Sequence, residues 1–293
     1  MDIENLKVAI YWGSYLVFPF LLLLWWLKRK GSLKTSSLVV WGLLSLLFIW
    51  TRFVEPNLIR VQVTEIQSHQ LQKRIAVISD MHLGIYKGAL FMRRVVDKLN
   101  ALKPDMVLIA GDFSYHPTDF NELIAPLNEI KAPVYAVLGN HDVGAPGADY
   151  RQELSKAIRA NGVKLLENEI VRFDDFTLVG LGDRFVAEDN ARLLKQVEFK
   201  EEVIVLTHNP DTTLDYRDVK ADYTICGHTH GGQVRLPFIG ALFLPVSGPF
   251  DHGLYREANT QLFVSSGLGE MGLPFRLLNP PVIDVLQFTP RKN

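Results

Sequence analysis

The distribution of hydrophobic positions divides the chain into two parts. Residues 8–27 and 35–51 are uncharged apolar runs, whereas from about residue 60 apolar residues occur in short stretches between polar ones. Twenty helical residues at ~1.5 Å rise span a hydrocarbon layer of roughly 30 Å. We therefore expect membrane-spanning helices at 8–27 and 36–54. They would form a hairpin within residues 1–58, followed by a separate domain over residues 59–293.

The flanks of the two runs support a membrane hairpin. The second run reaches residue 54 only if the charged group of Arg52 extends to the membrane surface. All five tryptophans lie near the ends of the runs, as interfacial aromatic side chains do: Trp12, Trp25, Trp26, Trp41 and Trp50. A cleaved signal peptide is the alternative. The acidic segment "MDIENLK" and the lack of a small-residue cleavage site after the first run favour the hairpin.

The charge of the linker predicts an orientation. The segment "KRKGSLK", residues 28–34, carries four cations, and the flanks outside the hairpin are less basic. The positive-inside rule places such a linker in the cytoplasm. We expect a multi-pass protein of the cell (inner or plasma) membrane with an extracytoplasmic catalytic domain. Because short hairpins can invert, a cytoplasmic domain is the alternative.

The second part alternates between strand and helix patterns. Strands are predicted at 61–67, 74–80, 105–112, 133–139, 176–181, 202–207, 222–226, 254–257, 262–265 and 282–288. Helices are predicted at 89–102, 119–130 and 150–160, the last ending before Gly162. The strand–helix–strand order predicts a parallel sheet in the first half, and the strand-rich last third predicts mixed or antiparallel pairing.

Polar residues with metal-binding side chains follow five of these strands. They occur in "SDMHLG", "AGDFS", "LGNHD", "LTHNP" and "ICGHTHGG", and the candidate ligands are Asp80, His82, Asp112, Asn140, His208, His228 and His230. A single histidine or aspartate at a strand end is more often a hydrogen-bonding loop residue. Five such motifs would meet at one sheet edge, where α/β proteins form their sites. Oxygen and nitrogen donors without cysteine suit Mn²⁺, Fe, Co²⁺, Ni²⁺ or Zn²⁺, and seven donors suffice for two ions.

Composition narrows the function classes. The formal net charge is −1, and no basic stripe with stacking aromatic residues is evident, so neither nucleic acid as a partner nor a nuclease is expected. The single cysteine, Cys226, excludes an internal disulfide framework.

The ordered set D-x-H, G-D, G-N-H-D, T-H and G-H-T-H resembles the calcineurin-like metallophosphoesterase superfamily over about residues 74–289. The tail "GGQVRLPFIGALFLP…GLY…SSGLGEMGLPFRLLNPP" resembles its membrane-anchored bacterial branch. That branch includes YkuE- and YaeI-type phosphodiesterases and is similar to chlamydial-type UDP-2,3-diacylglucosamine hydrolases. Ser266 stands where these relatives often carry arginine. This difference affects the expected contacts with the substrate phosphate and not the metal centre.

The resemblance implies an α/β fold, a four-layer αββα sandwich with mixed sheets, and two divalent metal ions, with Mn favoured among Mn, Fe, Zn, Co and Ni. It implies that Asp80, His82 and His230 hold the first ion, that Asn140, His208 and His228 hold the second, and that Asp112 bridges them. It also implies that His141 is catalytic near the leaving group, a role its pKa range suits. Asp142 either orients His141 or caps the turn.

Four further features carry alternative interpretations. Arg235 contacts a substrate phosphate or pairs with an acidic neighbour, and His116 and His252 either line the pocket or lie at the surface. The segment "LPFIGALFLP", residues 236–245, is either a buried strand pair or a lip that touches lipid.

The resulting hypothesis is a membrane-anchored phosphoesterase that cleaves phosphodiester or phosphomonoester bonds by attack of a metal-bridging hydroxide. Its partners would be the lipid bilayer and a phosphate ester that is lipid-linked or belongs to the cell envelope. The alternative is a UDP-2,3-diacylglucosamine pyrophosphatase of lipid A synthesis, which requires a cytoplasmic catalytic domain. A non-catalytic scaffold is less favoured because every expected ligand and His141 are present.

Overall fold

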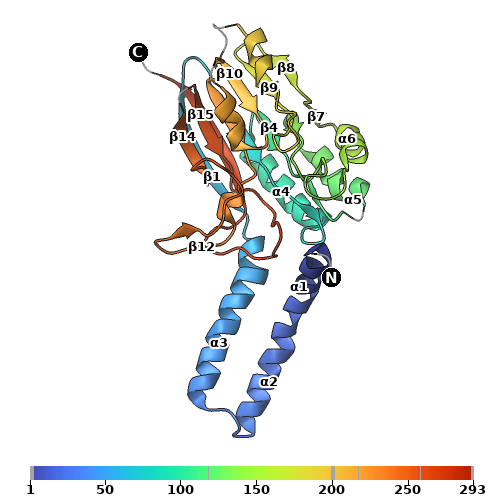
Figure 1. Cartoon of the computed structure of the whole chain (residues 1–293), viewed down its shortest axis with the longest axis vertical. Helices are drawn as coiled ribbons and strands as arrows, with labels where there is room; N and C mark the ends of the chain where they lie inside the picture. Colours follow the sequence, from blue (N-terminus) through green and yellow to red (C-terminus); the bar gives the residue numbers. More distant parts are fainter. Residues whose placement is uncertain (1–2, 118, 199–201, 217, 258, 292–293) are drawn as a thin grey trace.

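An apolar helical hairpin extends from one end of a layered α/β domain (Figure 1). The computed structural model describes residues 3–117, 119–198, 202–216, 218–257 and 259–291. The hairpin consists of α1 Ile3–Gly13, η1 Ser14–Leu16, α2 Val17–Arg29, α3 Thr35–Ile49, the π-helical turn η2 Trp50–Val54 and the 3₁₀ turn η3 Glu55–Asn57.

By length and composition, two segments of the hairpin can cross a membrane, Asn5–Arg29 and Thr35–Asn57. Only 11% of the apolar window of each segment is buried within the protein. The helices of a soluble core bury such residues, so these helices do not form a core with the rest of the chain.

The side chain of Arg52 does not extend outward, contrary to the prediction. It is buried, its Nε donates a hydrogen bond to Oγ of Ser14 at 2.9 Å, and its guanidinium lies 4.5 Å from the ring centre of Tyr11. These contacts with a hydroxyl and an aromatic face of the first helical arm join the two arms of the hairpin.

Two six-stranded sheets form the centre of the domain (Figure 1). The first sheet has the order β1 Arg60–Ser68, β16 Val282–Pro290, β2 Lys73–Ile78, β4 Met106–Ala110, β6 Val134–Val137 and β7 Lys164–Leu165. The second has the order β14 Gly253–Glu257, β15 Thr260–Val264, β11 Tyr223–Cys226, β10 Val203–Leu206, β9 Thr177–Gly180 and β8 Glu169–Arg172.

Strand directions are mixed, as predicted. The strands β2, β4, β6 and β7 are parallel, with Ile75 opposite Met106 and Val107 opposite Val134. The later strands include antiparallel pairs, β14 with β15 and β16 with β2, although β11 pairs with β15 in parallel. Two short pairs lie outside the sheets: β3 Leu83–Gly84 with β5 Ser114–Tyr115, and β12 Arg235–Leu236 with β13 Gly240–Ala241.

The side-chain alternation of the strands produces four layers. In β2, Ala76 and Ile78 face a core shared with helices α4 Ala89–Leu102, α5 Phe120–Ile124 and α6 Arg151–Ala160, whereas Ile75 and Val77 face the second sheet. On the outer face of the second sheet, Val203 and Val205 pack against η5 Ala191–Gln196 and residues after η6 Pro210–Asp215. The αββα sandwich is therefore confirmed, and 3₁₀ helices form its fourth layer.

One predicted helix is wrong in its length. The expected helix at 119–130 ends at Ile124 and continues as the 3₁₀ turn η4 Ala125–Glu129. Pro126 explains the change. Its nitrogen carries no hydrogen for the backbone hydrogen bond of an α-helix interior, and its ring clashes with the preceding turn.

Candidate metal centre

The candidate ligands lie on loops that leave the strands at one edge of the two sheets. Asp80 follows β2, Asp112 follows β4, and Asn140 follows β6 in the first sheet. His208 follows β10 and His228 follows β11 in the second. Because these strands are parallel within each sheet, their carboxyl ends bring distant segments of the chain together.

One group of donor atoms is formed by Asp80, His82, Asp112 and His230. One ligand atom from each of these buried residues lies within 4.8 Å of the others. Nε2 of His82 is 3.0 Å from Nε2 of His230 and 3.5 Å from a carboxylate oxygen of Asp112. Nε2 of His230 is also 3.5 Å from a carboxylate oxygen of Asp80. Two imidazoles and two carboxylates therefore aim lone pairs at one point.

A second group is formed by Asp112, His208 and His228, also within 4.8 Å of one another. Nε2 of His208 lies 3.2 Å from Oδ2 of Asp112, 3.1 Å from Nδ1 of His228 and 3.1 Å from Oδ1 of Asn140. Asp112 belongs to both groups. These seven side chains (Asp80, His82, Asp112, Asn140, His208, His228, His230) are called the metal centre below.

The backbone of the metal centre is strained at the ligands themselves. Positive φ angles, between 43° and 71°, occur at Asp80, His82, Asp112, His228 and His230. A left-handed conformation is uncommon for a residue with a side chain, and such residues concentrate at functional sites. These conformations turn the side chain of each residue toward its group of donor atoms.

Backbone N–H groups of neighbouring loops fix the carboxylates. The amide of His228 donates to both oxygens of Asp80 at 3.0 and 3.1 Å, and the amide of His141 donates to Oδ1 of Asp112 at 3.0 Å. Asp142 accepts from the amides of Phe113 and Gly139, each at 3.0 Å. The contacts of Asp142 thus hold two motif loops together, which favours a turn-holding role for it.

Two glycines are required where loops approach the carboxylates. A Cβ at Gly139 would lie 2.2 Å from Oδ1 of Asp112, and a Cβ at Gly227 would lie 2.4 Å from Oδ2 of Asp80. Both distances are far below van der Waals contact, so only glycine allows the loops to pass at these positions.

The electrostatics of the metal centre favour cations. Burial lowers the pKa of His82 and of His228 to about 3, and burial raises the pKa of Asp80 to about 7. Burial would also raise the pKa of Asp112, but attraction to His208 outweighs it and holds that pKa well below its usual value, and Asp112 in turn raises the pKa of His208 above its usual value. Neutral imidazoles that face one another and carboxylates that repel one another both gain from a bound divalent ion. The donor set therefore fits two such ions.

Small hollows flank the metal centre. His141 is partly buried, its ring centre lies 5.1 Å from that of His82, and it lines a hollow of about 50 Å³ together with His116 and Tyr150. His230 lines a second hollow, which is apolar and measures about 250 Å³. The structure thus places His116 beside His141 and not at a remote surface.

The remaining candidates, Arg235 and His252, lie beside Asp251. Nη1 of Arg235 donates to Asp251 and to the carbonyl of Gly231, each at 2.8 Å, and His252 is about half exposed beside the same aspartate. Arg235 is thus paired with an acidic neighbour, one of its two interpretations, and its carbonyl contact is adjacent to His230.

Sequence reasoning did not identify two buried residues beside the metal centre. Asp183 follows β9 in "GLGD", burial raises its pKa to about 6, and it interacts electrostatically with His208. The glycine–aspartate pair after a strand was the available signal. Asn279 donates from Nδ2 to the carbonyl of His230 at 2.6 Å. No local pattern marks Asn279, because its contact depends on a residue 49 positions away.

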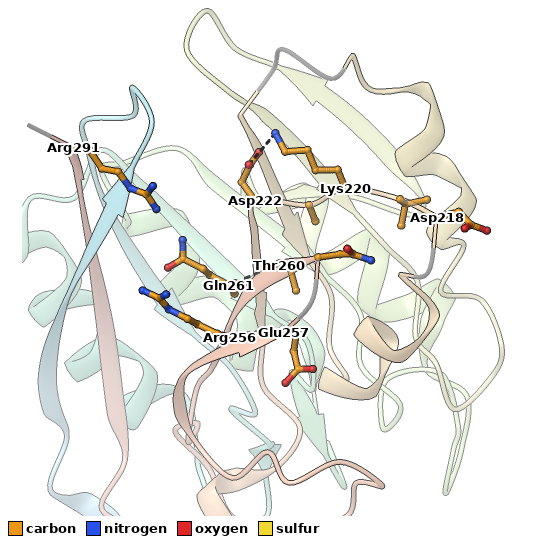
Figure 2. A pocket seen from close by; sticks show the side chains of 11 residues that line it. Asp218, Lys220, Asp222, Arg256, Glu257, Thr260, Gln261 and Arg291 are labelled. Atoms are coloured by element: carbon orange, nitrogen blue, oxygen red, sulfur yellow. Dashed lines mark hydrogen bonds and ion pairs between the residues drawn. The ribbon is translucent and has the colours of Figure 1, made fainter. Parts of the chain in front are cut away.

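A larger polar hollow lies away from this edge. It measures about 570 Å³ and is lined by residues around the beginnings of β11 and β15, where Lys220 points to Asp222 at 2.9 Å (Figure 2). Its charges of both signs include Arg256 and Glu257 (Figure 2). It contains none of the candidate ligands and is not part of the metal centre.

Comparisons with known proteins agree with the geometry. A family model described as calcineurin-like phosphoesterase matches residues 73–232. The chain is 30% identical over 276 residues to metallophosphoesterase YkuE of Bacillus subtilis, covering 87% of this chain and 93% of that protein. It is 27% identical over 237 residues to phosphodiesterase YaeI of Escherichia coli, covering 76% and 86%. It is 26% identical over 306 residues to UDP-2,3-diacylglucosamine pyrophosphatase LpxG of Chlamydia muridarum, covering 83% and 93%.

Proposed function

Because this chain belongs to the calcineurin-like phosphoesterase family and is a metallophosphoesterase, we propose that it is a membrane-anchored, two-metal hydrolase of phosphodiester or phosphomonoester bonds. The observation that carries the proposal is the pair of donor groups that share Asp112. A single structural ion would need only one of these groups.

The distances support a division of the ligands between two ions. Asp80, His82 and His230 would hold the first ion, and Asn140, His208 and His228 would hold the second. Asp112 would bridge them because its Oδ2 lies within 3.5 Å of ring nitrogens from both groups. Mn²⁺ is the favoured ion for this mixture of oxygen and nitrogen donors, and Fe, Zn²⁺, Co²⁺ and Ni²⁺ are alternatives.

Divalent ions bound there would supply Lewis acidity, lowering the pKa of water and neutralising charge on phosphoryl oxygens. The chain's own residues would do the rest. His141 lies at the rim of the hollow next to His82, where its imidazole can give a proton to the leaving alkoxide. Asp142 would keep the His141 loop in register with Asp112 through the amides of Phe113 and Gly139.

Membrane anchoring is supported by the exposed apolar surface of the hairpin. We assign residues 1–58 to the anchor and residues 59–293 to the catalytic domain, with Arg29 and Lys30 at the linker end. Their cations lie over Trp25 and Trp26, at 4.7 and 4.2 Å from the ring centres, as expected at a membrane–water interface. The basic linker favours an extracytoplasmic catalytic domain.

The substrate that we favour is a lipid or cell-envelope phosphate ester. The lip, residues 236–245, forms a short strand pair, but Phe238, Ile239 and Phe243 are exposed instead of buried. The alternative is a UDP-2,3-diacylglucosamine pyrophosphatase, favoured by the similarity to LpxG. A reporter fused after residue 293 distinguishes them, because a cytoplasmic reporter signal would favour the nucleotide lipid.

The test of the proposed chemistry is hydrolysis of bis(p-nitrophenyl) phosphate by the full chain in detergent. We expect activity with Mn²⁺, loss after chelation, recovery on adding Mn²⁺, and loss in His228→Ala. His69→Ala is the matched control, since its side chain is 65% exposed outside the metal centre. Full activity of His228→Ala, or of metal-stripped protein, would refute the mechanism.

A further inference from the structure

The apolar hollow beside His230 has no role in the chemistry described so far. Its volume is about 250 Å³. Most of its wall is hydrocarbon or aromatic, contributed by Val234, Leu242, Phe243, Pro245, Met271, Leu273 and Phe275. Small-molecule sites are concave and mostly apolar, so this hollow, called the acyl pocket below, has the properties of a ligand site.

The inner end of the acyl pocket is the metal centre. His230 and Thr229 form part of its wall. In the same loop, Nε2 of His228 donates to the carbonyl of Pro245, another wall residue, at 3.1 Å. A ligand in this pocket would therefore lie against a ligand loop of the metal centre.

The outer end of the acyl pocket reaches the hairpin. The ring of Phe275 contacts the ring of Phe48 in α3 with centres 5.4 Å apart. Leu242 and Phe243 are exposed and directly follow β13, and Phe238 is exposed in the turn between β12 and β13. Figure 1 shows β12 at the end of the domain from which the hairpin extends. A continuous apolar path thus runs from α3 to His230.

The side chain of Gln233, a polar group of the far wall, is already engaged. Nε2 of Gln233 donates to the carbonyls of Met271 and Leu273 at 3.2 and 2.8 Å, and its Oε1 accepts from the amide of Met271 at 2.8 Å. The Gln233 side chain thereby holds the far wall in place. It offers little to a polar ligand, so the hollow selects hydrocarbon.

We propose that the acyl pocket binds one hydrocarbon chain of a lipid phosphate ester and so holds its phosphate at the metal centre. The proposal rests on the proposed function, because it needs a phosphate ester at these ligands. The occupant is a chain from the bilayer, since the path from Phe48 to His230 is apolar and opens beside the membrane helices. Chain burial here would also contribute directly to substrate binding.

The test uses a series of p-nitrophenyl alkyl phosphates that differ only in chain length, from ethyl to dodecyl. The full chain is loaded with Mn²⁺ and assayed below the aggregation concentration of each ester. We expect kcat/KM to rise by at least tenfold from ethyl to dodecyl, because each buried methylene favours binding several-fold until the pocket is full. Equal values across the series would overturn the proposal.

Two variants separate the pocket from membrane partition. Leu273→Asp places a charge in the wall, and Leu242→Trp narrows the pocket while keeping its mouth apolar. We expect both to reduce the ratio of kcat/KM between the dodecyl and the ethyl ester to about threefold or less. Leu214→Asp is the control for Leu273→Asp, because the two leucines are 44% and 45% exposed and Leu214 lies outside the pocket.

The outcomes distinguish this proposal from the proposed function. Hydrolysis of bis(p-nitrophenyl) phosphate without chain-length dependence leaves the function intact and overturns the pocket. If no ester is hydrolysed, calorimetric titration of the Mn²⁺-loaded chain with dodecyl and ethyl phosphate decides the pocket alone. We expect dodecyl phosphate to bind at least tenfold more tightly and Leu242→Trp to remove that difference. Equal affinities would overturn the proposal.

Discussion

Two clusters of buried charged side chains lie on neighbouring loops of the molecule, and they are compensated in opposite ways. In the metal centre, Asp80 and Asp112 face histidines whose ring nitrogens converge with them. In the second cluster, called the junction cluster, Glu55, Lys87, Glu270 and Arg276 lie where the hairpin joins the domain. There, protein cations face protein anions.

The junction cluster is satisfied from within the chain. Nζ of Lys87 lies 3.2 Å from Glu270 and also donates to the carbonyl of Pro56. Arg276 is fully buried and donates to the carbonyls of Ser266, Gly267, Gly269 and Asn279. The two clusters show that burial and charge alone do not identify a catalytic site. The distinguishing property is the kind of partner: the carboxylates of the metal centre face imidazole nitrogens that can bind a metal ion, whereas those of the junction cluster face lysine and arginine.

The largest effect is expected from a substitution in the metal centre. Asp80→Asn keeps an oxygen for the amide of His228 but removes a charged ligand. We expect kcat/KM for bis(p-nitrophenyl) phosphate to fall about 10³-fold, the scale on which one electrostatic group acts. The metal-free protein should unfold at the same or a higher temperature, because burial makes this carboxylate costly. A melting temperature that is several degrees lower with chelator present would show that Asp80 stabilises the metal-free protein, contrary to this expectation.

In the junction cluster, a substitution is expected to lower the stability of the chain. Glu270→Ala leaves Lys87 and Arg276 buried without their carboxylate, which we expect to destabilise the full chain by about 3–5 kcal/mol. Denaturant titration in detergent measures it. The matched control is Glu167→Ala, whose partner Arg159 is about half exposed, with an expected loss of about 0–1 kcal/mol. Equal losses would show that burial does not separate the two pairs.

The metal centre was accessible from the sequence, and the junction cluster was not. Asp80, Asp112 and His208 each follow a strongly apolar strand, so local periodicity alone placed them at one sheet edge. The contacts of Glu55 and Arg276 join residues over 200 positions apart, through loops without periodicity. Residues 236–245 also lack a periodic pattern, so the sequence allowed both a buried and an exposed interpretation of them. Only the tertiary structure shows that Phe238 and Phe243 are exposed.

A third prediction tests whether the two clusters are linked. The amide of Asn279 donates to Glu55 at 2.6 Å, and its side chain donates to the carbonyl of His230 at 2.6 Å. We expect Asn279→Ala to weaken Mn²⁺ binding about tenfold, as loss of a group that orients a metal ligand does. Calorimetric titration with Mn²⁺ measures this.

The control for that variant is Asn100→Ala, which removes a comparable side-chain contact, at 2.8 Å to the carbonyl of Glu129 in another part of the domain. Its Mn²⁺ affinity should match that of the unmodified chain. If Asn279→Ala also binds Mn²⁺ normally, the hairpin does not help to position His230, and the two clusters are independent.

The smallest effect is expected at Asp284, a buried carboxylate in β16 that belongs to neither cluster. Burial raises its pKa to about 7, and Oδ2 has no hydrogen-bond partner among the described residues. The folded protein therefore keeps a proton there that the unfolded chain releases near pH 4, so this residue costs stability as the pH rises from about 4 to 7. We expect Asp284→Asn to stabilise the chain by roughly 1 kcal/mol at pH 7.5 and to have no such effect at pH 4. Thermal melting at both pH values measures the difference. A gain that is equal at both would mean that packing, and not the uncompensated charge, sets the cost of this buried carboxylate.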